Sequence, residues 1–139
     1  MSAVLLDVNL LLALAWPNHQ HHALAHGWFQ REAIHAWATC ALTQLGFVRL
    51  SSNPAFTEEA VTPMEAATLL RRFCDHRAHR FWESPPACNP DLYKHAIGHQ
   101  QVNDAWLVEA ARHNKGRLAT LDFRLRAHDA SGKLVVVVS

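Results

Sequence analysis

The sequence predicts an α/β fold in which a mainly parallel sheet is flanked by helices. Short apolar runs typical of strands alternate with segments typical of helices, and this βαβα order indicates a parallel sheet. Two of the apolar runs, residues 3–7 and 117–122, end in an aspartate. A chain of 139 residues that is 50% hydrophobic can bury a proper core, so we expect a single domain over residues 1–139.

The first half of the chain alternates strands and helices. Pro17 closes the first helix, because proline cannot continue a helix interior. The third helix must end before Asn53, since the residue before a proline disfavours helical backbone. We expect, in order, a strand at residues 3–8, a short helix at 10–14, a helix at 22–32, a strand at 36–39 and a helix at 42–50.

The second half of the chain contains the clearest helix start. Thr62-Pro63-Met64-Glu65 combines a capping box with a proline at the first helical position, which predicts a helix at 63–73. Four consecutive valines near the C-terminus favour a strand that is buried on both faces. The remaining expected elements are a strand at residues 80–82, a surface loop at 84–90, a helix that begins at Asp104 and ends at residues 114–116 with a C-terminal glycine, and a strand at 118–121. The run of valines belongs to a last expected strand at 134–138.

Composition limits the partners and the compartment. Thirteen Lys and Arg against twelve Asp and Glu give a net charge of +1, so binding to nucleic acid would depend on a local patch. The three cysteines are widely spaced and form no CxxC pair, which favours a reduced intracellular protein. No charged leader and no apolar stretch of about 18 residues is present. We therefore expect a cytoplasmic protein without a membrane segment.

Four polar residues are expected to form one site. Asp7, Gln44, Asp104 and Asp122 each fall at the end of a strand-like run or at the start of a helix. The carboxyl ends of neighbouring parallel strands face the same crevice, where such sheets usually bind ligands. Carboxylates gathered there suit Mg²⁺ or Mn²⁺, which can activate water and neutralise charge on a phosphodiester. The pattern therefore indicates metal-assisted hydrolysis.

A purely structural role for these aspartates remains an alternative. Asp104 could serve only as a helix cap, because an aspartate at a helix start accepts backbone hydrogen bonds. Asp7 is harder to explain in this way, since an acid that directly follows four apolar residues is costly to bury without a partner.

The chain resembles PIN-domain ribonucleases, specifically the VapC-type toxins of bacterial toxin-antitoxin pairs. The similarity runs over nearly the whole length and rests on four segments in a specific order and spacing. These segments are Val4-Leu5-Leu6-Asp7-Val8-Asn9, residues 37–50, Val102-Asn103-Asp104-Ala105-Trp106-Leu107 and Leu118-Ala119-Thr120-Leu121-Asp122. The resemblance implies a Rossmann-like PIN fold, Mg²⁺- or Mn²⁺-dependent cleavage of RNA, homodimerisation and neutralisation by a small antitoxin protein in the active-site groove.

One departure from the family pattern concerns the central helix. Many members carry a glutamate where this chain has Gln44. An amide oxygen can still bind a cation, but the site loses one negative charge and Gln44 cannot act as a general base. We expect weaker metal binding than in a site with four carboxylates. This departure keeps open a second reading, in which the protein binds RNA or its antitoxin without efficient cleavage.

Arginines are the candidates for contact with RNA. Arg49 lies beside the central motif, and Arg124 and Arg126 closely follow Asp122. A guanidinium can hold a phosphate through two hydrogen bonds, although any of these residues could simply keep the surface soluble. Which RNA is cut depends on groove shape and RNA structure, which the sequence does not specify.

Two other kinds of site compete with this interpretation. His22 and His26 are four residues apart, close to His19 and His21, as in some zinc sites, but no cysteine or acid lies at a supporting interval. A strand that ends in aspartate also begins the haloacid dehalogenase phosphatases. Those enzymes need a second aspartate two residues later, where this chain has Asn9.

Overall fold

The computed structural model describes residues 2–83 and 86–139 and confirms the α/β fold. Its parallel strands are β1 (Val4–Leu6), β2 (Trp37–Cys40), β3 (His79–Trp82), β4 (Arg117–Thr120) and β5 (Val135–Val137). Its α-helices are α1 (Val8–Ala15), α2 (His22–Trp28), α3 (Ala41–Ser51), α4 (Pro63–Cys74) and α5 (Val102–His113). A π-helical segment, Phe29–Ala33, continues α2, and a 3₁₀ helix, Phe123–His128, follows β4.

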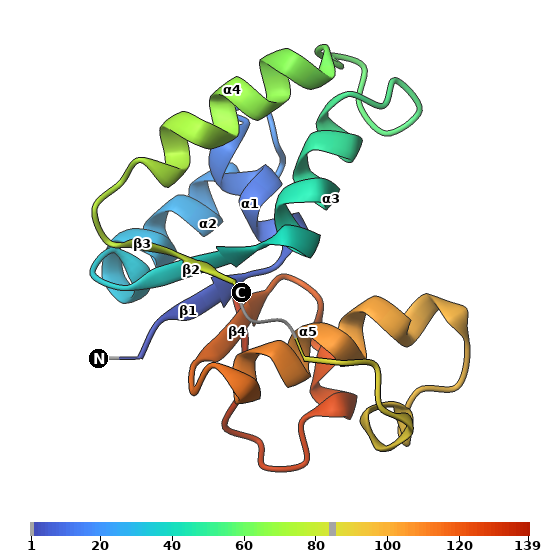
Figure 1. The fold of residues 1–139 in the computed structure, drawn as a ribbon. Coiled ribbons are helices and arrows are strands. Elements are labelled where there is room, and N and C mark those ends of the chain that lie inside the picture. The colour runs from blue at the N-terminus through green and yellow to red at the C-terminus, as the bar shows by residue number, and fades with distance from the viewer. Residues whose placement is uncertain (1, 84–85) are drawn as a thin grey trace.

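The sheet separates two hydrophobic layers (Figure 1). Helices α1 to α4 cover one face and α5 covers the other. Side chains alternate along each strand, so Val4 and Leu6 face the first layer while Leu5 faces the second. Because both faces are covered, β1 and β2 are buried along their whole length, and Thr39 of β2 is the one polar residue in these two strands.

The order of strands positions a site. In the sheet the order is β3-β2-β1-β4-β5, so the chain builds outward from β1 first to one side and then to the other. Leu5 of β1 is opposite Leu118 of β4 in the parallel register. The carboxyl ends of β1 and β4 therefore lie side by side at the point where the strand order reverses, which is where open α/β sheets bind ligands.

The helix start predicted at Thr62 is confirmed. The Thr62 hydroxyl accepts a hydrogen bond from the Glu65 backbone at 3.1 Å, and the Glu65 carboxylate accepts one from the Thr62 backbone at 3.3 Å. Pro63 occupies the first helical position, where its missing N–H leaves no hydrogen bond unmade.

Two sequence predictions were wrong in detail. The C-terminal strand β5 contacts both hydrophobic layers but is an edge strand, so Val136 and Val137 are only half-buried, because no described strand pairs with its outer side. After the end of α5, the residue with positive φ is Lys115 (φ 56°) and not Gly116, which the sequence suggested as the helix-ending glycine. Gly116 is required for a different reason, since a Cβ there would lie 2.4 Å from the backbone oxygen of Ala3.

Positions 84–85 of the predicted surface loop at 84–90 lie outside the described residues. Across the rest of the chain, no helix combines the length and the apolar character that crossing a membrane would require.

Candidate active site

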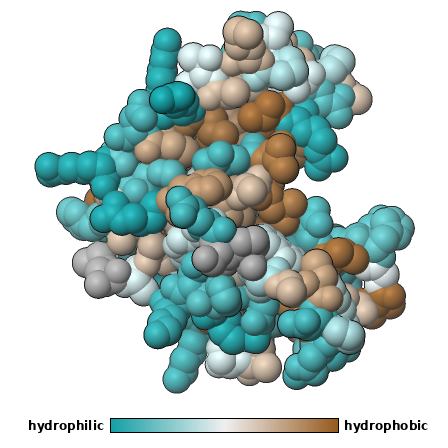
Figure 2. Space-filling view, viewed as in Figure 1, coloured by the Kyte–Doolittle hydropathy of each residue, from teal (hydrophilic) through white to brown (hydrophobic). Residues whose placement is uncertain are grey.

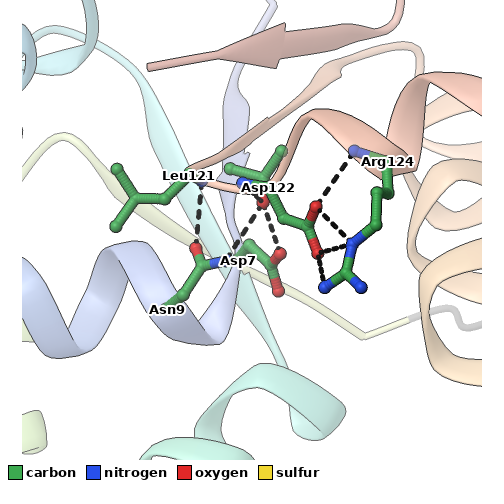
Figure 3. A network of polar contacts seen from close by, with 6 residues as sticks. Asp7, Asn9, Leu121, Asp122 and Arg124 are labelled. Atoms are coloured by element: carbon green, nitrogen blue, oxygen red, sulfur yellow. Dashed lines mark hydrogen bonds and ion pairs between the residues drawn. The ribbon is translucent and has the colours of Figure 1, made fainter. Parts of the chain in front are cut away.

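Asp7 lies at the centre of the site (Figure 3). It follows β1 directly and caps α1, where its Oδ1 accepts a hydrogen bond from the Val8 backbone at 2.7 Å. Its Oδ2 accepts a second one from the Thr120 hydroxyl, also at 2.7 Å. Only 7% of the residue is exposed, so the carboxylate is held in one orientation among apolar neighbours. The prediction that Asp7 ends a buried strand and needs partners is confirmed.

Thr120 and Asn9 are site residues that sequence reasoning missed. The Thr120 hydroxyl donates to Asp7 and accepts from the Asn9 amide at 3.2 Å and from the Asp122 backbone at 3.1 Å. The Asn9 oxygen in turn accepts from the Leu121 backbone at 3.2 Å. These bonds tie the end of β1 to the end of β4 (Figure 3). The available signal was a polar side chain two residues from Asp7 and another two residues from Asp122.

Asp104 reaches the same cleft from the opposite wall. The cleft has a volume of about 620 Å³ and lies between α3 and α5, with Asp7 and Asp104 both in its lining. Asp104 belongs to the first turn of α5, two residues after the helix begins. Arg49 of α3 lines the cleft as well, with an exposed side chain. Figure 2 shows the molecule hollowed on this side, with hydrophobic side chains over α3.

Asp122 follows β4 and points to Arg124. The Arg124 backbone nitrogen and Nε donate to Oδ1 at 3.0 and 2.9 Å, and Nε and Nη2 donate to Oδ2 at 3.1 and 2.8 Å (Figure 3). Asp122 is not part of the lining of the cleft that holds Asp7 and Asp104. Arg126, two residues further on, is exposed and forms no ion pair with any described residue.

The three aspartates differ in charge environment. Burial, together with the smaller effect of the negative charges of Asp104 and Asp122, raises the pKa of Asp7 to about 6 against the opposing hydrogen bonds from Thr120 and Val8. Burial, followed by the charge of Asp122, also raises the pKa of Asp104. The hydrogen bonds from Arg124 hold the pKa of Asp122 below its usual range. The charges of His128 and Arg124 oppose the rise at Asp104 only in part, and neither Asp7 nor Asp104 forms an ion pair with a described residue.

The donor set fits a hard divalent cation in its chemistry. Carboxylate oxygens are the ligands that Mg²⁺ and Mn²⁺ prefer, and a cation would stabilise the ionised carboxylates whose pKa values burial and, to a smaller extent, mutual repulsion raise. Within residues 2–83 and 86–139, however, no three His, Cys, Asp or Glu side chains lie close enough together to hold a metal ion. Asp7 and Asp104 share the cleft, while the carboxylate of Asp122 forms an ion pair with Arg124.

Gln44 does not join the aspartates. Its amide nitrogen donates to the Thr39 hydroxyl at 3.1 Å and lies 4.0 Å from the Cys74 sulfur. It lines a separate apolar groove between α3 and α4. The reason is helical geometry: the cleft is lined by positions 42, 45, 46, 49 and 50 of α3, and position 44 is turned about 200° from position 42.

The histidine alternative also finds no support in the described residues. No group of three metal-binding side chains occurs there, and the Nδ1 atom of His22 lies 2.8 Å from the Ala13 carbonyl oxygen. That contact joins α2 to α1, which is a structural role.

Comparison with known families matches residues 4–130 to the PIN domain. The chain belongs to the PIN-domain family. Ribonuclease VapC39 of Mycobacterium tuberculosis is 39% identical over 137 residues, which cover 96% of this chain and 98% of that relative. Ribonuclease VapC38 of the same species is 42% identical over 118 residues, covering 85% and 84%. Ribonuclease VapC44 is 35% identical over 125 residues, again covering 85% and 84%.

The family match replaces the dehalogenase alternative. In this PIN domain, position 9 is an asparagine whose side chain joins the first turn of α1 to the end of β4 instead of serving as a second acid. Hydrogen bonds from Val8 and Thr120 hold Asp7, and Asp104 lines the same cleft.

Replacing Thr120 by Val should weaken this support. The near-isosteric change removes the hydroxyl that joins Asp7, Asn9 and Asp122, so buried polar groups lose their partner. We expect the free energy of unfolding to fall by about 1–3 kcal/mol and metal affinity by roughly 10–100-fold. Urea denaturation and Mn²⁺ titration measure the two effects. Thr120→Ser keeps the hydroxyl and should retain most of both, and equal losses in the two variants would contradict this role.

Replacing Gln44 by Glu should not increase cleavage. The new carboxylate would face the groove between α3 and α4 and could not donate to Thr39. We expect a loss of about 1 kcal/mol in stability and unchanged metal affinity. Denaturation and Mn²⁺ titration of the variant provide the check, and a large gain in metal affinity would show that position 44 reaches the aspartates.

Proposed function

We propose that this PIN-domain protein is a metal-dependent endoribonuclease and the toxin of a type II toxin-antitoxin pair. The observation that carries the proposal is the placement of Asp7 and Asp104 in one cleft at the carboxyl ends of the strands, with Asp122 outside its lining but near enough for its charge to act on both. The names of three relatives, each a VapC ribonuclease, support the same activity. RNA phosphodiesters are the substrate class.

Asp7, Asp104 and Asp122 are the residues that would hold Mg²⁺ or Mn²⁺. A bound ion of this kind supplies activation of water and neutralisation of charge at the phosphate. The chain itself supplies orientation, because Val8 and Thr120 fix both oxygens of Asp7 before any ligand arrives. Arg49 lines the cleft and would hold a backbone phosphate of RNA.

A second candidate is a PIN module that binds RNA or antitoxin without efficient cleavage. The observation that favours it is the pairing of Asp122 with Arg124, which leaves the described residues without a close group of three metal-binding side chains. Gln44, which suggested this alternative from sequence, lies in a different groove and does not support it.

Cleavage of a mixed RNA pool by purified protein tests the two candidates. The assay compares wild type with Asp7→Asn, in Mn²⁺, in Mg²⁺ and in EDTA. Fragments that need the metal and disappear in the variant would establish the nuclease. RNA retained on the wild-type protein without fragments above the level of the variant would establish the binding module instead.

The partners follow from the same proposal. A small antitoxin and a second copy of the chain are the protein partners that the family resemblance implies. Exposed apolar side chains support such contacts, since Leu45 is 68% exposed and lines both the cleft and the groove between α3 and α4. Light scattering on the purified protein tests the dimer, for which we expect twice the mass of the 15.6 kDa chain.

A further inference from the structure

The pair between Asp122 and Arg124 has a property that a simple surface ion pair lacks. A carboxylate offers about four lone-pair positions, and Arg124 fills two on each oxygen of Asp122 through its backbone nitrogen, Nε and Nη2. Asp122 therefore has no acceptor position left for a metal ion while this pair persists. The hydrogen bonds also keep the pKa of Asp122 low, so the carboxylate stays ionised and paired.

The two partners differ in their access to solvent. The side chain of Arg124 is 78% exposed, whereas that of Asp122 is 22% exposed. A ligand from solution would thus meet the guanidinium first. A phosphate is a natural competitor for it, because its oxygens match the planar fork of the guanidinium as a carboxylate does.

We propose that Arg124 holds Asp122 away from the metal in the RNA-free protein, and that an RNA phosphate releases Asp122 by taking its place on Arg124. The inference rests on the proposed nuclease function and adds a coupling to it. Binding of RNA and binding of the metal then assist each other, because each favours the state in which the pair is open. Arg124 acts through Asp122 and is a positioning residue.

The size of the coupling follows from the exposure of the pair. Exposed ion pairs contribute little to stability, so opening this one should change metal affinity by about five-fold and not by orders of magnitude. A five-fold difference in Mn²⁺ affinity still distinguishes a protein that binds the ion more tightly in the presence of RNA from one whose affinity does not depend on RNA.

Titration with Mn²⁺, followed by the electron paramagnetic resonance signal of the free ion, measures metal affinity without any cleavage. We would compare the wild type with Arg124→Gln, Arg124→Lys and Arg126→Gln, each with and without a short single-stranded DNA whose intactness is checked on a gel. Arg126 is the matched control, because it carries the same charge in the same 3₁₀ helix without an ion pair to a described residue. A titration of the DNA alone corrects for ions that it binds.

The proposal predicts that Arg124→Gln binds Mn²⁺ about five-fold tighter than wild type without DNA, and that DNA tightens the wild type but not this variant. Arg124→Lys should fall between the two, since it keeps the charge but loses the bidentate fork. Equal gains in Arg124→Gln and Arg126→Gln would reduce the effect to charge and overturn the proposal.

Failure of this inference is distinguishable from failure of the proposed function. A wild type that cleaves RNA and binds Mn²⁺ with the same affinity with and without DNA would overturn the coupling alone. A wild type that neither binds Mn²⁺ nor cleaves RNA would overturn both.

Discussion

Replacing Asp7 by Asn is expected to reduce metal-dependent RNA cleavage by roughly a thousand-fold while increasing stability at neutral pH. Asp7 is the one buried acid of the site, and two hydrogen bonds orient its carboxylate, so the nearby Asp104 and Asp122 do not replace its charge at that position. Asparagine keeps an oxygen that can accept from Val8 or Thr120. Cleavage rates and urea denaturation at pH 7 measure the two effects.

The raised pKa of Asp7 predicts the direction in which stability changes with pH. The pKa of Asp7 is raised from 3.8 to about 6, so between these values the folded protein binds a proton that the unfolded chain has lost. The free energy of unfolding should therefore fall as pH rises through this window and stay lower above it, by roughly 2–3 kcal/mol at most. Asp7→Asn should remove this slope, and added Mn²⁺ should offset the loss in the wild type at pH 7. An unchanged slope in the variant would contradict the assignment.

Replacing Trp37 by Ala should have the largest effect on stability. Trp37 of β2 has no exposed surface and packs edge-on against Phe29 at 5.6 Å and Phe73 at 5.5 Å between ring centroids. Its ring also lies 4.7 Å from that of His79. Truncation leaves a cavity that these rings can fill only in part, so we expect a loss of about 3–5 kcal/mol in the free energy of unfolding.

Denaturation in urea, followed by circular dichroism, tests the Trp37 prediction. Phe123→Ala is the matched control, because this aromatic side chain is 69% exposed and its removal should change stability by less than about 0.5 kcal/mol. Similar losses in the two variants would show that Trp37 contributes no more to the core than a surface aromatic residue.

Elements with a strong local signal were predictable from the sequence. The capping box at Thr62, the buried strand before Asp7 and the alternation of strands with helices all depend on residues that are close in the chain. Such signals act through local backbone hydrogen bonds and side-chain periodicity, which the sequence displays directly. The edge position of β5 was not predictable in this way, because burial of a strand depends on neighbours distant in the sequence.

The sequence by itself determined the α/β class and the three aspartates that follow strands or begin a helix. Only the tertiary structure decided which of them share a cleft, that Thr120 fixes Asp7 across 113 positions of the chain, and that Gln44 faces another groove. The physical reason is distance along the chain. A residue type and its local element are encoded nearby, whereas the partner of a side chain depends on how β1, β4, α3 and α5 pack against one another.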